Sequence, residues 1–122
     1  MLRLAVLIFG IGFIFAGVAA FMPAYMKHGL FLGYFEVNTM HNVIHAVSGV
    51  VAIVSALNMR YAKLYFKIFG ILYGIVAIVG FALKGDLSFM MMHMNMADNV
   101  LHAIIAVVAL YLGFFAAKRV SN

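Results

Sequence analysis

Cysteine is absent from this chain of 122 residues, and charged side chains are scarce. Without cysteine the protein can form no disulfide and no thiolate metal site, and it has no cysteine nucleophile. Charged residues make up only 9% of the chain, and three of them are acidic. An average soluble domain has about a quarter of its residues charged. No side chains form a pattern that supplies a nucleophile, its base and an orienting group, so we do not expect an enzyme.

Hydrophobic residues fill 68% of the chain. So short a chain cannot bury that much apolar surface in a water-facing fold, so we expect a lipid bilayer around it. Four apolar segments have about the 20 residues that cross a bilayer: 4–22, 39–59, 64–83 and 96–117. Lipid excludes open sheet edges, so each is predicted to be helical. We therefore expect an all-α membrane protein with four transmembrane helices in a single transmembrane domain, 1–122.

The two halves of the chain resemble each other. IFGIGFIFAGVAAF (8–21) aligns with IFGILYGIVAIVGF (68–81), and NTMHNVIHAVSGVVAIVSAL (38–57) aligns with NMADNVLHAIIAVVALYLGF (95–114). This pattern indicates a duplicated helical hairpin, with repeat 1 at about 1–59 and repeat 2 at about 60–122. Short connections then favour an up-down-up-down four-helix bundle. Segment 4–22 also fits a signal peptide, but its internal counterpart 64–83 favours a retained helix.

The basic residues predict an orientation. Six of the eight fall at the termini or around a middle loop expected at 60–63: Arg3, Arg60, Lys63, Lys67, Lys118 and Arg119. Cytoplasmic loops carry the excess of lysine and arginine, so both termini are predicted to be cytoplasmic, with loops 23–38 and 84–95 outside. All five histidines and all three acidic residues then lie toward the outer side. No stripe of basic and aromatic residues suggests nucleic-acid binding.

Small residues follow two histidines at helical spacing. Two series share this pattern: His45, Gly49, Ala52 and Ala56, and His102, Ala106, Ala109 and Gly113. Small residues let transmembrane helices approach closely, so we expect both series to face the interior of the bundle. The two histidines are therefore predicted to approach one another near the bundle axis.

The sequences NVIHAVSG (42–49) and ADNVLHAIIAV (97–107) carry a family resemblance. In a four-helix membrane chain of this length they resemble an uncharacterised family of small bacterial membrane proteins, a domain-of-unknown-function family. In that family an N-x-x-H motif opens helices 2 and 4. The matching residues are Asn42, His45, Asp98, Asn99 and His102. The resemblance covers nearly the whole chain and implies a bacterial inner membrane location, but it brings no activity with it.

The histidines form a candidate metal site. His41 and His45 are four residues apart and share one helix face, and Asp98 and His102 repeat this spacing. Three imidazoles and one carboxylate suit a transition metal such as zinc, iron, nickel or copper. Asn42 and Asn99 lie beside the histidines and could orient them by hydrogen bonds.

Other interpretations of the same residues remain open, among them transport and the binding of an anion or a lipid headgroup. Asn38 and Asn95 have the character of helix N-caps, with Asp98 in the first turn, and the histidines and asparagines could simply hydrogen-bond between helices. The protein would then be structural, docking to another membrane protein or to a second copy. Alternatively, His45 and His102 could ligate a haem b from two facing helices.

A methionine-rich segment precedes the last apolar run. FMMMHMNMADN (89–99) contains five methionines and His93. Thioether and imidazole together suit copper(I). Methionine also fills irregular gaps and inserts at a lipid interface, so an interfacial loop is the alternative.

Overall fold

Four α-helices make up most of the computed structural model, which describes residues 1–116. They are α1 (Leu2–Ala19), α2 (Thr39–Ser55), α3 (Met59–Ala82) and α4 (Met96–Leu110), and the π-helical turn η3 (Tyr111–Phe115) continues α4. α1, α3 and α4 together with η3 are long and apolar enough to cross a membrane, whereas α2 is shorter, at 17 residues. Lys118, Arg119 and the end of the predicted segment 96–117 lie outside the described residues.

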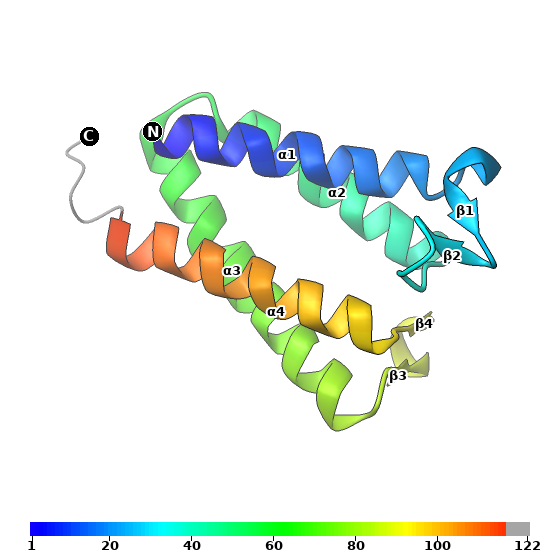
Figure 1. The fold of residues 1–122 in the computed structure, drawn as a ribbon. Coiled ribbons are helices and arrows are strands. Elements are labelled where there is room, and N and C mark those ends of the chain that lie inside the picture. Colours follow the sequence, from blue (N-terminus) through cyan, green and yellow to red (C-terminus); the bar gives the residue numbers. More distant parts are fainter. Residues whose placement is uncertain (117–122) are drawn as a thin grey trace.

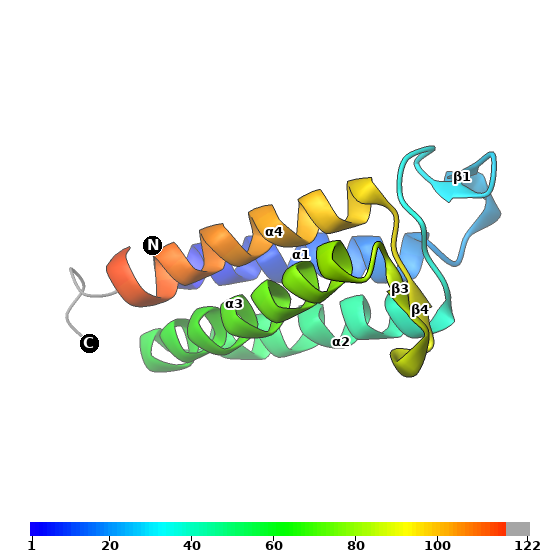
Figure 2. The same cartoon turned by 90° about the horizontal axis from the view of Figure 1, so that it is seen from below.

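The helices associate as two antiparallel pairs. α1 packs along α2 and α3 packs along α4, while α3 also contacts α1 and α2 (Figures 1 and 2). The N-terminus and the short turn between α2 and α3 lie at one end of the molecule, and two small β-hairpins lie at the other (Figure 1). The first turns of α2 and α4 are therefore both at the hairpin end.

Asparagine side chains cap the N-termini of three of the helices. The Asn38 side chain accepts a hydrogen bond from the His41 amide, and the Asn95 side chain accepts one from the Asp98 amide. These two N-caps confirm the prediction from sequence. Asn58 caps α3 in the same way, so that helix begins at Met59 and the predicted middle loop at 60–63 is wrong. Residues 60–63 instead form the first turn of α3, because a capped helix start satisfies free backbone N–H groups.

Both longer connections contain a two-stranded antiparallel hairpin that the sequence analysis did not predict. The first has the 3₁₀ turn η1 (Pro23–Tyr25), β1 (Met26–Lys27) and β2 (Leu30–Phe31). The second has β3 (Asp86–Leu87), the 3₁₀ turn η2 (Ser88–Met90) and β4 (Met92–His93). Each helix pair therefore consists of a helix, a small hairpin and a returning helix.

Glycine allows close helix packing within each pair. A Cβ atom on Gly49 would lie 2.7 Å from the carbonyl oxygen of Gly10, and one on Gly113 would lie 2.8 Å from the amide of Lys67. Such distances are shorter than real Cβ contacts, so these helices approach along glycine faces. The small-residue series that begin at His45 and His102 lie at these contacts, as expected.

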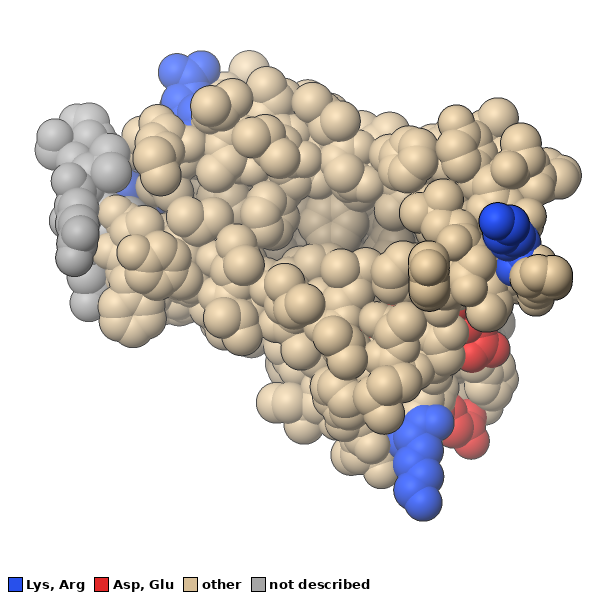
Figure 3. Space-filling model, in the orientation of Figure 1, with Lys and Arg blue, Asp and Glu red and all other residues tan. Residues whose placement is uncertain are grey.

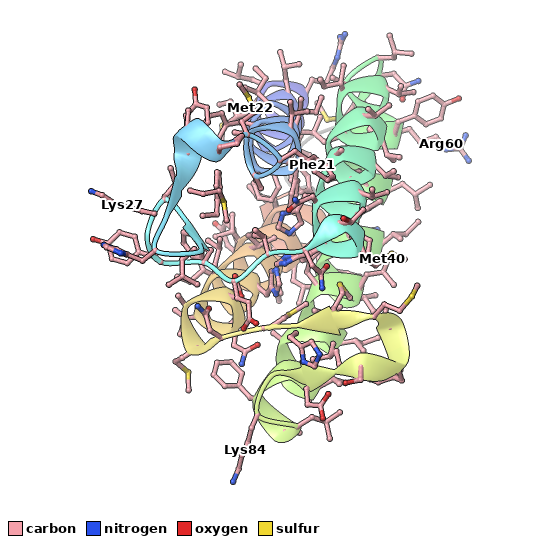
Figure 4. All side chains as sticks on the ribbon, turned by 90° about the vertical axis from the view of Figure 1, so that its right-hand side faces the viewer. Phe21, Met22, Lys27, Met40, Arg60 and Lys84 are labelled. Atoms are coloured by element: carbon pink, nitrogen blue, oxygen red, sulfur yellow. The ribbon has the colours of Figure 1, made fainter. Side chains whose placement is uncertain are left out.

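The outer surface of the helices is apolar. Many large aliphatic and aromatic side chains on all four helices are exposed. In the space-filling view the charged residues gather toward the two ends, and a band without charge separates them (Figure 3). At the hairpin end, Lys27 and Lys84 extend outward from the first and second halves (Figure 4). A surface of this kind fits contact with lipid acyl chains.

Candidate metal centre

Three histidines converge between α2 and α4 near the hairpin end. His41 and His45 lie one turn apart on α2, and His102 projects from α4. The ring centres of His41 and His45 are 4.3 Å apart, and that of His102 lies 5.4 Å from His41 and 5.8 Å from His45. One ligand atom from each ring lies within 4.8 Å of the others, so the three side chains could hold one metal ion.

All three imidazoles are buried, and four of their six ring nitrogens lack a hydrogen-bond partner among the described residues. His41 and His102 are each 2% exposed and His45 is 7% exposed. Within the described residues, both ring nitrogens of His41, Nε2 of His45 and Nδ1 of His102 have no partner at normal hydrogen-bonding geometry. Leaving one buried polar atom unsatisfied costs about 1–3 kcal/mol. Several such atoms on three neighbouring rings would be satisfied by a ligand shared between those rings.

Asp98, the fourth predicted ligand, is not part of this cluster. Its carboxylate oxygen Oδ2 accepts hydrogen bonds from the amides of Asn95 at 3.0 Å and Glu36 at 3.2 Å. The first bond completes a capping box with Asn95 at the start of α4. The second joins the segment before α2 to the start of α4. The Oδ2 atom of Asp98 therefore takes part in the capping box of α4 and in a contact with the segment before α2.

Asn42 and Asn99 were predicted to orient the histidines. Both side chains are buried, and both residues lie close to the histidines in the sequence. The side-chain oxygen Oδ1 of each has no hydrogen-bond partner among the described residues. Asn99 instead packs its amide against Gly80 of α3, where a Cβ atom would clash with it. The expected hydrogen bonds from histidine to these two oxygens are therefore absent from this arrangement.

An apolar cavity of about 290 Å³ adjoins the histidines. Its lining comes from α2, α3, α4 and the second hairpin, and includes His41, His45, His102, Tyr73, Met92 and Met94. A site with three protein ligands and free space beside them leaves room for a further ligand, as in open metal centres. The cavity supplies that space.

Tyr73 and Ser48 form a polar pair at the edge of the cavity that the sequence analysis missed. Their hydroxyl oxygens are 2.9 Å apart, and the Ser48 hydroxyl also donates to the carbonyl of Ile44. The Tyr73 ring lies 5.6 Å from the ring of His102 and 6.4 Å from that of His45. In the sequence, Tyr73 is one aromatic residue in a continuous apolar run, so nothing marked it as a neighbour of the histidines.

His28 and His93 lie away from the cluster, on the exposed hairpins. Nδ1 of His93 is 3.8 Å from a carboxylate oxygen of Asp86 across the β3–β4 pair. Hydrogen bonds from the side chain and the backbone amide of Ser88 hold the pKa of Asp86 below its usual value. These exposed histidines provide natural controls for the buried ones.

Residues 3–115 match the family described as Domain of unknown function (DUF4383). The chain belongs to this family. The match confirms the predicted membership of an uncharacterised family, and it spans all three clustered histidines together with the four helices. No curated protein and no solved structure matches the chain significantly. Since DUF4383 brings no activity with it, the function has to be argued from the site.

Proposed function

We propose that this protein is a small integral membrane protein that binds one transition-metal ion through His41, His45 and His102. The observation that carries the proposal is the convergence of three buried imidazoles whose ligand atoms lie within 4.8 Å of one another. Neutral imidazole is a preferred ligand of zinc, copper and iron. The adjoining cavity leaves a position for a further ligand, so the ion would be accessible to exchange or to a small molecule.

The membrane arrangement that supports this role has four spans. α2 has 17 residues, at the short end of the range of about 17–25 that crosses a bilayer. With α2 included, the chain runs up-down-up-down as a four-helix bundle with both termini in the cytoplasm. Arg3, Arg60, Lys63 and Lys67 support this orientation because they lie at the end opposite the hairpins. The metal site then lies near the outer face of a bacterial inner membrane.

A reciprocal pair of hydrogen bonds supports the proposed duplication into repeats 1–59 and 60–122. The side-chain amide of Asn38 donates to the carbonyl of Met91 at 3.0 Å, and that of Asn95 donates to the carbonyl of Tyr34 at 2.8 Å. Both the donors and the acceptors are related by the same offset of 57 residues. An approximate twofold axis along the membrane normal would exchange the two bonds. We refer to this pair as the asparagine clasp.

An ion fits the geometry better than the two alternatives do. A haem between His45 and His102 would need a flat slot between their rings, whose centres are 5.8 Å apart, and the His41 ring lies against both. Histidines that only join helices would be expected to hydrogen-bond across the interface, whereas four of the six ring nitrogens have no partner within residues 1–116. A metal satisfies several of them at once.

Elemental analysis of the purified protein tests the proposal. The protein is extracted in mild detergent, loaded with zinc, copper or iron salts, freed of excess ion and measured for bound metal. We expect about one ion per chain, and loss of that ion in the His45→Ala/His102→Ala double variant. His28→Ala/His93→Ala is the matched control, because it removes two exposed histidines and should keep the ion.

Helix content by circular dichroism separates loss of the site from loss of the fold. A double variant that keeps its helix content and loses its metal supports the proposal. If the double variant does not fold, the single change His102→Gln keeps a side chain of similar polarity and tests the same ligand. A folded wild-type protein that binds none of the three metals would overturn the proposal, as would full metal occupancy in the folded double variant.

A further inference from the structure

The second hairpin directs two methionine side chains toward the candidate metal centre. Successive residues of a strand point to opposite sides. Along β4 and the residue after it, Met92 is 2% exposed, His93 is exposed and Met94 is 5% exposed. Met92 and Met94 pack with Leu87 against side chains of α2 and α3. Figure 4 looks onto this end of the molecule, where the hairpin (yellow) crosses in front of the helices.

The two inward methionines and the three histidines line the same cavity. Met92, Met94 and the half-exposed Met90 contribute to its wall together with the imidazoles. The lining contains no carboxylate. A cavity with imidazole nitrogen and thioether sulfur as its donor atoms offers the softer ligands that select copper(I), while zinc and iron(II) sites commonly add carboxylates or thiolates.

The charges around the cavity also favour an ion of low charge. The three ligating imidazoles are neutral when they bind a metal. The first turns of α2 and α4 bring positive ends of helix dipoles to this part of the molecule, and Oδ2 of Asp98 already accepts two backbone amides. Desolvation of an ion grows with the square of its charge, and repulsion from a helix N-terminus grows in proportion to it. A monovalent cation is therefore disfavoured much less than a divalent one.

We infer that the ion is copper(I), and that a thioether from Met92 or Met94 on the second hairpin completes a four-coordinate shell with His41, His45 and His102. This inference rests on the proposed metal site and specifies its ligand. Met90, partly exposed at the cavity wall, gives the ion a first thioether contact on its way in. The methionine-rich segment 89–99 then has a binding role as well as a packing role.

Anaerobic titration tests the assignment. Wild-type protein in detergent is titrated with copper(I) buffered by the chromophoric chelator bicinchoninate, and separately with zinc(II). The Met92→Leu/Met94→Leu double variant keeps nearly the same side-chain volume and removes only the sulfur atoms. Met96→Leu is the control, because Met96 is 65% exposed in the first turn of α4 and lies outside the cavity lining.

We expect the wild-type protein to bind one copper(I), and the double variant to bind it about tenfold or more weakly, the scale on which metal sites respond to altered surroundings. Zinc(II) binding and the Met96→Leu control should be unchanged. X-ray absorption at the copper edge should show sulfur scattering in the wild-type protein that is lost in the double variant. Unchanged helix content in all variants establishes that the fold is intact.

The outcomes distinguish this inference from the metal site on which it rests. Equal copper(I) affinity in the double variant, with no sulfur scattering in the wild-type protein, overturns the thioether ligands and leaves the histidine site. Tight zinc(II) binding with weak copper(I) binding overturns the choice of ion and also leaves the site. Failure of the folded wild-type protein to bind copper, zinc or iron overturns the proposed function itself.

Discussion

Replacing Gly17 with alanine should disturb the metal centre, although Gly17 is not one of its ligands. Gly17 lies on α1 and faces the turn of α2 that carries His41 and His45. A Cβ atom on Gly17 would lie 2.6 Å from the amide nitrogen of Ala46 and 2.7 Å from the carbonyl oxygen of Asn42. Both atoms belong to the backbone of α2 and cannot rotate away, so the helix itself must move.

The size of this movement follows from the distances. Ordinary contact of a Cβ atom begins at 3.4 Å, so α2 has to retreat by about 0.8 Å from α1. Metal–ligand distances tolerate deviations of only about 0.2 Å. His102 lies on α4, so the movement of α2 shifts His41 and His45 relative to it. We therefore expect metal affinity to fall by about ten- to a hundredfold, and overpacking to cost about 1–3 kcal/mol of stability.

Gly12→Ala is the matched control on the same helix. A Cβ atom on Gly12 meets nothing within 4 Å, and alanine favours a helix by about 1 kcal/mol over glycine. Metal affinity by competition titration and the thermal unfolding midpoint in detergent are compared for the two variants. Equal affinities and equal midpoints would refute the reasoning that backbone contact at Gly17 positions the histidines.

Three further predictions concern acid, the clasp and topology. Acidification should release the ion before the helices unfold, since only neutral imidazole binds metal and a proton competes for each ligand nitrogen; metal affinity that stays constant down to the pH at which helix content by circular dichroism is lost would exclude imidazole ligands. Asn38→Ala and Asn95→Ala should each lower the free energy of unfolding by about 1 kcal/mol more than Asn58→Ala does. Asn58→Ala is the control because it removes an N-cap without a clasp bond. Three equal losses would mean that the clasp contributes nothing. Reporter fusions after residue 122 should be active only with a cytoplasmic reporter, and fusions within 84–95 only with a periplasmic one; the reverse result would turn the histidine site toward the cytoplasm.

The helices and their caps were predictable because each depends on local sequence. A run of about 20 apolar residues has few alternatives to a helix in lipid, and an asparagine at a helix start bonds to an amide only three residues away. Asn58 carries the same local signal as Asn38 and Asn95. It was missed because the charged residues that follow it were interpreted as a loop, although lysine and arginine can lie in the first turn of a helix at the membrane interface.

The hairpins could not be predicted from pattern alone. Each strand has two residues, too few for an alternation of apolar and polar side chains to show. Positive φ occurs at His28 between β1 and β2 and at Met91 between β3 and β4, and neither is a glycine, so the sequence gives little warning of these turns. The inward direction of Met92 and Met94 depends on this strand geometry and was therefore hidden as well.

The candidate site was only partly predictable because one residue can serve two purposes. The spacing of His41 and His45 and the repeat position of His102 identified the three imidazoles that the structure places together. Asp98 has equally good spacing for a ligand, but its carboxylate also suits a capping box, and local hydrogen bonds to backbone amides decided its position. The Asp98 carboxylate also accepts a bond from the Glu36 amide, 62 residues away in the sequence. A contact of that kind cannot be predicted from local sequence.

The asparagine clasp has a consequence for the order in which the molecule is completed during synthesis. The Asn38 side chain at the start of α2 donates to the carbonyl of Met91, and the Asn95 side chain at the start of α4 donates to that of Tyr34, so each capping asparagine also bonds to the other half. When residues 1–59 have entered the membrane, two of the three histidines are present and the third has not been made. An ion bound by all three histidines could therefore be enclosed only after the second half has docked on the first. Metal capture would then mark the last step of assembly, and a chain stalled halfway would offer only the two imidazoles of α2.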